Sequence, residues 1–252
     1  MRVGRSMKEV KSVRITTIVD NDVWKEGLAS SWGLSFHAEV FMEDAERHGV
    51  LMDTSGSFEK FHKNSSKLGI ELTGVEGVFI SHWHGDHMGA LGQVLPLVEH
   101  SVPVYVPSAN SSGIREIEAA DGKPVVCSEP TEITEGLMST GRMPTGLSEH
   151  SLIINVKDKG LVVLTGCSHP GIINILKRAR EVSGVDRVYA VMGGFHISGM
   201  NVGVRVGEFL KELNVEIAGP CHCTGQDARN GIAKVMNEKY VKIGSGKTIT
   251  IG

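Results

Sequence analysis

SHWHGDHMG, residues 81–89, holds three histidines and an aspartate within the six positions from His82 to His87. GVFIS (77–81) reads as a short buried strand, and the apolar spacing over 88–99 is typical of a helix. The histidine-rich stretch therefore lies in a strand-to-helix loop, where functional residues are commonly found.

The spacing within this loop predicts that four side chains face one space. His82 and His84 are two positions apart, so an extended backbone points both to the same side. Gly85 permits a sharp turn, after which Asp86 and His87 open the helix. Imidazole and carboxylate groups together suit zinc, iron or manganese. The alternatives are a polar loop without a shared role and a structural zinc site, which would favour a closed, cysteine-rich set of ligands.

The rest of the chain predicts an α/β fold of the layered α+β kind, in a single domain spanning 1–252. Helical periodicity alternates with runs of β-branched residues, and KDKG (157–160) is typical of a hairpin turn. We expect helices at 57–67, 88–99, 111–120, 170–182, 201–213 and 225–236. We expect strands at 13–20, 37–42, 49–54, 77–81, 102–107, 151–156, 161–166, 187–193, 215–219 and 247–251.

Composition excludes several classes of protein. The formal charge is −3 over 252 residues, which gives no reason to expect a polyanion such as nucleic acid as a partner. No apolar run approaches the roughly 20 residues that cross a membrane. The basic N-terminus, MRVGRSMKEVKSVRITTIVD, lacks the apolar core of a secretory signal, and four cysteines are too few for a disulfide scaffold. We therefore expect a cytoplasmic protein with a small-molecule substrate; the oligomeric state is left open.

The pattern His-x-His-x-Asp-His at 82–87 resembles the metal signature of the metallo-β-lactamase superfamily. VLMDTSG (50–56) resembles that family's strand and aspartate turn, which places Asp53 beside the metal ligands. The resemblance implies an αββα sandwich with a two-metal site at one edge. It also implies that His82 and His84 bind the first ion, while Asp86 and His87 bind the second.

The remaining ligands are expected after other strands. In LVVLTGCSHPG (161–171), Cys167 stands where the superfamily usually has a bridging aspartate. A thiolate there could bridge both ions, bind one of them, or only pack. His169 is expected to complete the first ion's shell. It is preferred to His150, which lacks the family's usual Gly-His-Thr surroundings.

Two further segments follow strand-like runs near the C-terminus. In AGPCHCTG (218–225), His222 is expected to be the last ligand of the second ion, with Cys221 and Cys223 pointing away from an extended strand to pack. In VMGGFHISGMN (191–201), His196 is expected to hold a substrate phosphate or carboxylate, or to act as an acid. The alternative for His196 is a loop histidine bonded to backbone.

The motifs Gly-Cys-Ser-His, Gly-Gly-Phe-His and Cys-His-Cys-Thr-Gly, with the early segment Trp-Gly-Leu-Ser (32–35), resemble one subgroup of the superfamily. That subgroup includes 7,8-dihydropterin-6-methyl-4-(β-D-ribofuranosyl)aminobenzene 5′-phosphate synthases. The resemblance implies two divalent metal ions, zinc first, with iron, manganese or magnesium as alternatives. It implies a phosphorylated, ester-type or pterin-like substrate.

Two reactions fit this machinery: hydrolysis, and a transfer that releases diphosphate. In hydrolysis, Asp86 would orient or deprotonate the attacking water as well as bind metal. Aromatic residues in the substrate region could stack on a planar ring. The candidates are Trp24, Trp32, Phe36 and Phe195, with core packing as the alternative for each. A protein of a different class, a non-catalytic or single-metal binding or regulatory protein, is the alternative to an enzyme.

Overall fold

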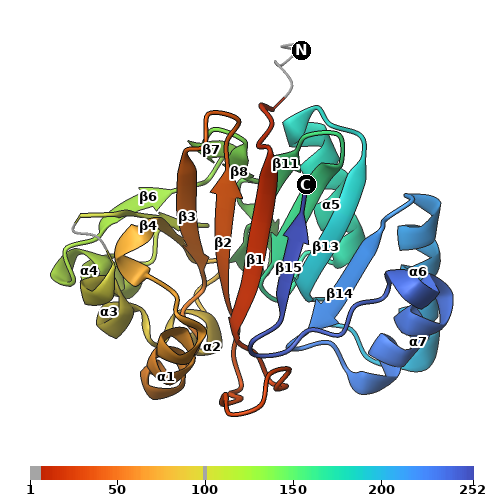
Figure 1. The fold of residues 1–252 in the computed structure, drawn as a ribbon, viewed down its shortest axis with the longest axis horizontal. Coiled ribbons are helices and arrows are strands. Elements are labelled where there is room, and N and C mark those ends of the chain that lie inside the picture. The colour runs from red at the N-terminus through yellow and green to blue at the C-terminus, as the bar shows by residue number, and fades with distance from the viewer. Residues whose placement is uncertain (1–6, 99–100) are drawn as a thin grey trace.

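The computed structural model describes residues 7–98 and 101–252. Two large β-sheets face each other in the middle of the molecule, with helices outside them (Figure 1). The first sheet is seven-stranded, and its strands lie in the order β15 (Thr248–Ile251), β1 (Ser12–Val19), β2 (Ser35–Phe41), β3 (Arg47–Met52), β4 (Val75–Phe79), β5 (Pro103–Val106) and β6 (Lys123–Val126).

The second large sheet comes mostly from the later part of the chain. Its strands lie in the order β14 (Ile217–Cys221), β13 (Val188–Gly194), β12 (Gly160–Thr165), β11 (Leu152–Val156), β8 (Leu137–Ser139) and β7 (Thr131–Thr134). A small separate sheet pairs β9 (Met143–Thr145) with β10 (Leu147–Glu149).

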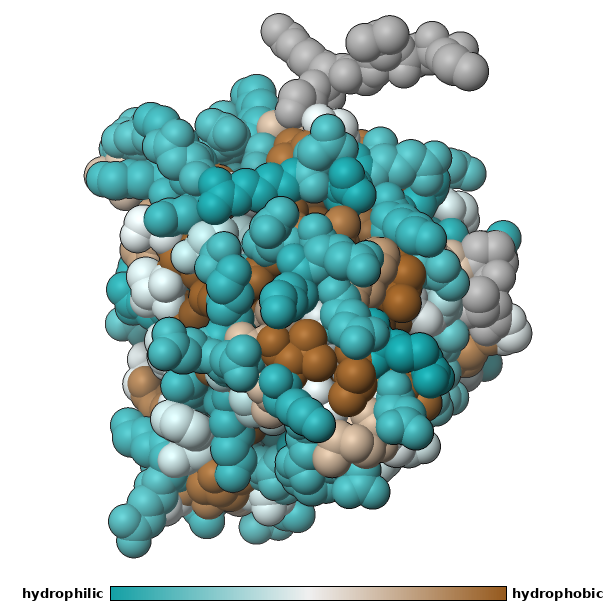
Figure 2. Space-filling view, turned by 90° about the vertical axis from the view of Figure 1, so that its right-hand side faces the viewer, coloured by the Kyte–Doolittle hydropathy of each residue, from teal (hydrophilic) through white to brown (hydrophobic). Residues whose placement is uncertain are grey.

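Helices form the two outer layers. Figure 1 shows one group on the left, α1 (Phe58–Leu68), α2 (Gly85–Met88), α3 (Leu91–Val94) and α4 (Ser111–Ala119). The group on the right is α5 (Ile172–Ser183), α6 (Met200–Glu212) and α7 (Gln226–Met236). The right-hand face is mostly hydrophilic, with hydrophobic residues in small patches (Figure 2). Short 3₁₀ turns occur at Leu72–Gly74, Leu95–Leu97 and Asn237–Lys239. Among the described residues, no helix has the length and apolar character needed to cross a membrane.

Strand alternation explains the layering. Successive residues of a strand point to opposite faces, so a strand covered on both sides must be apolar throughout. In β11, Leu152 and Ile154 pack into the cluster between the two sheets, whereas Ile153 packs into the cluster under α5–α7. On the other side, Leu51 of β3 packs with Phe61 of α1. The order of layers is therefore helix, sheet, sheet, helix, and the αββα prediction is confirmed.

Parallel pairing brings the functional segments to one edge. β3, β4, β5 and β6 are mutually parallel neighbours in the first sheet, as are β12, β13 and β14 in the second. Loops at the carboxyl ends of parallel strands meet on the same side of a sheet, which is where ligands bind in open α/β sheets. The segments that follow β3, β4, β12, β13 and β14 are the ones that carry the predicted site residues.

The expected strands are confirmed within a few residues, and the turn at 157–160 joins the antiparallel strands β11 and β12. The expected helix at 88–99 is wrong. The segment divides into the end of α2, then α3 and a 3₁₀ turn. Ala90 leaves helical geometry at φ −96° and ψ 2°, and Pro96 has no backbone N–H to continue a helix. Residue 99 and residues 1–6 of the basic N-terminal segment lie outside the described residues.

Candidate metal centre

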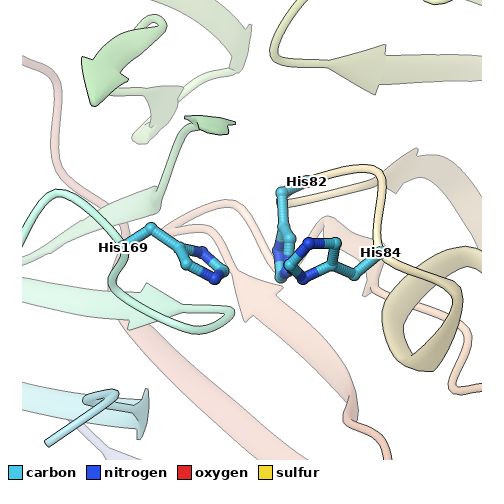
Figure 3. Close-up of side chains that lie close together, drawn as sticks. All are labelled: His82, His84 and His169. Carbon is cyan, nitrogen blue, oxygen red and sulfur yellow. The ribbon is translucent and has the colours of Figure 1, made fainter. Parts of the chain in front are cut away.

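Three histidines form the first group of donor side chains. His82 and His84 come from the loop after β4, and His169 comes from the loop after β12 (Figure 3). His82 Nε2 lies 3.1 Å from His84 Nδ1, and the ligand nitrogens of all three residues lie within 4.8 Å of one another. The rings point toward a common space, so two loops from different sheets place three imidazoles around one point.

A second group lies beside the first. His87 Nε2 and His222 Nε2 are 3.1 Å apart, and Asp86 Oδ2 is 3.2 Å from His222 Nε2 and 3.7 Å from His87 Nε2. Asp86 and His87 belong to α2, while His222 follows β14. The predicted ligands of the second ion are thus brought together from the two sheets.

Cys167 lies between these groups. Its Sγ is 3.2 Å from His87 Nε2, and the thiol also lies within 4.8 Å of donor atoms of His82, His169 and His222. This is the position expected of a side chain that contacts one ion or both. Cys167 therefore does not pack away from the other donor side chains, which was one of the three roles left open for it.

A buried carboxylate orients His87. Asp53 accepts hydrogen bonds from the Ser81 backbone N–H at 2.8 Å, the Ser81 hydroxyl at 2.7 Å and His87 Nδ1 at 2.7 Å. Burial raises the pKa of Asp53, and the bonds from Ser81 oppose that rise. Burial also lowers the pKa of His87 to about 3, which keeps its imidazole neutral and available to a metal ion.

Glu149, which was not predicted from the sequence, orients the loop after β12. Its carboxylate accepts the backbone N–H groups of Cys167, Ser168 and His169 at 3.0, 2.8 and 2.8 Å, and His169 Nδ1 at 2.8 Å. Burial opposes ionisation of Glu149, but these bonds, led by that from His169, hold its pKa at about 2. The same pair raises the pKa of His169. The only signal in the sequence was an acidic residue shortly before the apolar run at 151–156.

The arrangement of hydrogen bonds fits a cation between the donors. His87 donates Nδ1–H to Asp53, and His222 donates Nδ1–H to Asn21 Oδ1 at 3.2 Å, because the Asn21 amide nitrogen is engaged with the His222 carbonyl. In the neutral rings both Nε2 atoms then carry lone pairs that face each other at 3.1 Å. Asp86 adds another acceptor to the same space. Acceptors that converge in this way need a positive charge between them.

His150 does not join either group in the described part of the chain. Its ring stacks on Phe79 at 3.9 Å, and its nitrogens bond to the Ile80 carbonyl at 2.9 Å and the Ser139 hydroxyl at 2.8 Å. Burial lowers its pKa to about 3. The preference for His169 over His150 at this site agrees with the geometry.

The expectation that Cys221 and Cys223 both point away is wrong for Cys223. His222 has a φ of 49°, so the backbone turns and is not extended at this point. Cys221 packs in the core between the sheets, whereas Cys223 lies within 4.8 Å of donor atoms of Cys167 and His222. Strand alternation fails here because the strand has already ended at Cys221.

The aromatic candidates separate by exposure. Phe36 and Phe195 are fully buried, so a stacking role on substrate is wrong for both. Trp24 lies under the Lys247 ammonium, 3.8 Å from the ring centroid. Trp32 is 66% exposed, and its ring centroid is 5.3 Å from that of His222. Trp32 alone of the four presents an open ring face beside the site.

His196 lies beside the first donor group, within 4.8 Å of donor atoms of Cys167 and His169. It is exposed, it follows β13, and its ring centroid lies 4.7 Å from that of His169. Its φ of 48° turns the chain just before α6 begins. The residue therefore places an exposed imidazole next to the first donor group.

Comparisons with known proteins agree with this geometry. The chain is 27% identical to a 7,8-dihydropterin-6-methyl-4-(β-D-ribofuranosyl)-aminobenzene-5′-phosphate synthase of Methanocaldococcus jannaschii, over 99% of each sequence. It is 28% identical to the solved structure of Tm1679, described as a metal-dependent hydrolase of the β-lactamase superfamily, with a TM-score of 0.75 over 94% of this chain and 98% of the other. A diphosphatase of the PhnP family shares the fold at 14% identity, with a TM-score of 0.58 over 94% and 97% of the two chains.

The family model of the metallo-beta-lactamase superfamily matches residues 41–168, which is about half of the chain and includes the loop after β4 and most of the first donor group. The layered fold, the histidine signature and these likenesses lead to one assignment. The chain belongs to the metallo-beta-lactamase superfamily.

Proposed function

We propose that this chain is a two-metal enzyme that acts on a phosphorylated or ester-type small molecule. The observation that carries the proposal is the presence of two adjoining donor groups with Cys167 between them. One group is His82, His84 and His169, and the other is Asp86, His87 and His222. Structural metal sites close around a single ion, so two adjoining groups favour catalysis.

The donor set favours zinc or iron. Imidazole nitrogens and a thiol are borderline or soft ligands, whereas magnesium and manganese prefer oxygen. Two such ions, when bound, would polarise a phosphoryl or carbonyl oxygen and lower the pKa of a bound water. Because thiols in this site must stay reduced to bind metal, we also propose a cytoplasmic setting. The four cysteines are free in the structure.

The protein groups then supply position and proton transfer. Asp86 is half-buried at the edge of the second group, where its carboxylate could orient a water and accept its proton. His196 is exposed and adjoins His169, so it can hold an anionic substrate group or donate a proton to a leaving group. The backbone N–H groups at the start of α6 reinforce binding of an anion there.

Two reactions are consistent with these donor groups. The full-length likeness to a protein named as a pterin-phosphate synthase favours a transfer, in which an aminobenzene carbon attacks a pterin methylene as diphosphate leaves. The likeness to a protein described as a metal-dependent hydrolase favours hydrolysis, in which water attacks the phosphorus or carbonyl centre. Both reactions would use the same donor groups, and the residues that surround them would select the substrate.

Metal content and turnover test this function together. We expect the purified chain to hold two equivalents of zinc or iron by mass spectrometry, and His84→Ala to lose metal and activity. Release of diphosphate from a pterin diphosphate and an aminobenzene ribotide would identify the transferase. Hydrolysis of a chromogenic phosphodiester without that release would identify the hydrolase.

The non-catalytic alternative makes a different prediction. A binding or regulatory protein would hold one tightly bound ion and would turn over neither substrate. Glu181→Gln serves as a control for handling, because Glu181 is 69% exposed and pairs with Arg178 on the surface of α5, outside the donor groups. It should match the wild type in metal content and in rate.

A further inference from the structure

We propose that Cys223 is, together with Cys167, a thiolate ligand of the second ion, so that this ion is held by two sulfurs and is selected for thiophilic metals such as zinc or ferrous iron. The inference rests on the proposed two-metal function and specifies one half of its metal site. It adds a ligand that neither the signature at 82–87 nor the strand pattern predicted.

The geometry that supports it is a second set of close donors. The sulfurs of Cys167 and Cys223 and a ring nitrogen of His222 lie within 4.8 Å of one another. The two cysteines come from the loops after β12 and β14, 56 positions apart in the chain. Cys223 Sγ is also 3.7 Å from the Cys167 carbonyl oxygen, so the loops pack directly against each other.

The local backbone is built to turn Cys223 inward. His222 adopts a left-handed conformation, and the Thr224 N–H closes the turn on the Cys221 carbonyl at 3.0 Å. The Thr224 hydroxyl then accepts the Phe195 N–H at 2.9 Å, which anchors the turn to the loop after β13. Two hydrogen bonds therefore fix the turn that places the half-buried Cys223 thiol beside the second donor group.

Gly194 leaves the space that this sulfur occupies. A methyl group at Gly194 would lie 2.6 Å from Cys223 Sγ and 2.5 Å from the Gly166 carbonyl oxygen. No ordinary side chain fits there without moving the thiol or the backbone. The lack of a side chain at this position is what allows three loops to converge on the sulfur.

The two donor groups differ in charge. The first group consists of three imidazoles and carries no negative charge, whereas the second would combine the carboxylate of Asp86 with two thiolates. Binding would release both thiol protons to solvent, since the thiolate is the form that binds metal. An anionic, sulfur-rich half binds its ion more tightly and excludes magnesium, which prefers oxygen ligands.

Cys221 provides a matched control. It is adjacent to His222, it is fully buried in the core between the sheets, and it belongs to none of the donor groups found among the described residues. Serine at this position can bond to the neighbouring Asp20 carboxylate, which already interacts with the Cys221 thiol. Cys221→Ser thus perturbs the same turn without removing a donor from the site.

Cobalt substitution tests the proposal without recourse to activity. Cobalt(II) bound to thiolate gives a near-ultraviolet charge-transfer band whose intensity grows with the number of cobalt–sulfur bonds. We expect Cys167→Ser and Cys223→Ser each to reduce this band to that of one bond, and to weaken binding of the second cobalt by at least about 10-fold. Cys221→Ser should keep the wild-type band and affinity.

Retention of the full band and affinity in Cys223→Ser would overturn the inference while leaving the two-metal function intact. If that variant does not fold, X-ray absorption at the cobalt edge of the wild-type protein decides the matter: two sulfurs per pair of ions are expected, and one or none contradicts the proposal. Failure of the wild type to bind cobalt at all would instead refute the two-metal function, and this inference with it.

Discussion

The Nε2 atoms of His87 and His222 lie 3.1 Å apart, although 135 positions separate the two residues in the chain. One ring is fixed from behind by Asp53 and the other by Asn21. Each support determines which nitrogen carries the proton and leaves the other free toward its partner. The fold thus holds two lone pairs at a distance that a shared cation would bridge.

Asp53→Asn tests the support behind His87. The amide keeps the size of the side chain but can present N–H where His87 Nδ1 now donates, so the ring should lose its preferred tautomer. We expect affinity for the second ion to fall by about 10–100-fold, the loss typical of removing such a partner. Titration calorimetry with zinc measures it. Asp186→Asn is the control, because that side chain is 96% exposed; equal affinity in both variants would argue against the role of Asp53.

Glu149→Gln tests the buried carboxylate that holds the loop after β12. The amide cannot accept from all of the backbone N–H groups of 167–169 and His169 Nδ1, so at least one buried donor loses its partner. We expect the free energy of unfolding to fall by about 1–3 kcal/mol in metal-free protein. Urea denaturation gives the value. A loss below about 0.5 kcal/mol, as expected of an exposed surface substitution, would show that the loop does not depend on this carboxylate.

Much of the fold and half of the site follow from local pattern. Alternation identified the long strands, and the spacing at 82–87 identified four donors. Residues such as Glu149 and Asn21 were missed because their roles depend on contacts with distant loops, which no local period records. The direction of the Cys223 side chain was predicted wrongly because the strand pattern assumes an extended backbone. The left-handed conformation of His222 turns the chain, so the Cys223 side chain points toward the donor groups.

The short strands β6–β10 were missed for a related reason. They are three or four residues long and lie in 123–149, where the exposed and half-buried positions mix without a clear period. Pairing with neighbouring strands stabilises them in the folded chain, and isolated short segments carry little signal of their own.

Trp32→Ala tests whether the exposed ring contacts substrate. If Trp32 stacks on a planar part of the substrate, its loss should raise KM by about 5- to 10-fold, the effect of an aromatic contact worth about 1 kcal/mol, with kcat nearly unchanged. Steady-state kinetics on the natural substrate measures both constants. Trp24→Ala is the matched control, since Trp24 is 49% exposed but lies under Lys247. Similar effects in the two variants would remove the assignment.

His150→Phe tests the acid sensitivity of the folded chain. The unfolded His150 binds a proton below about pH 6.5, whereas the buried ring resists protonation until the pKa of about 3. The residue therefore reduces stability as pH falls through this window, by about 1.4 kcal/mol per pH unit, and has no such effect above it. We expect the free energy of unfolding of the variant to depend less steeply on pH between pH 6 and 4. The difference in slope should be about 1.4 kcal/mol per pH unit, the contribution of one proton, and urea denaturation measures it.

The exposed His62 supplies the comparison for that experiment. His62→Gln should leave the slope of stability against pH near that of the wild type. If His150→Phe also leaves the slope unchanged, protonation of His150 is not what destabilises the fold in acid.

Anomalous diffraction from crystals of the zinc-loaded protein tests the central claim most directly. The two-metal account predicts two peaks of anomalous density, one contacting His82, His84 and His169, and the other contacting Asp86, His87 and His222. A single peak, or peaks that touch neither set of side chains, would contradict it.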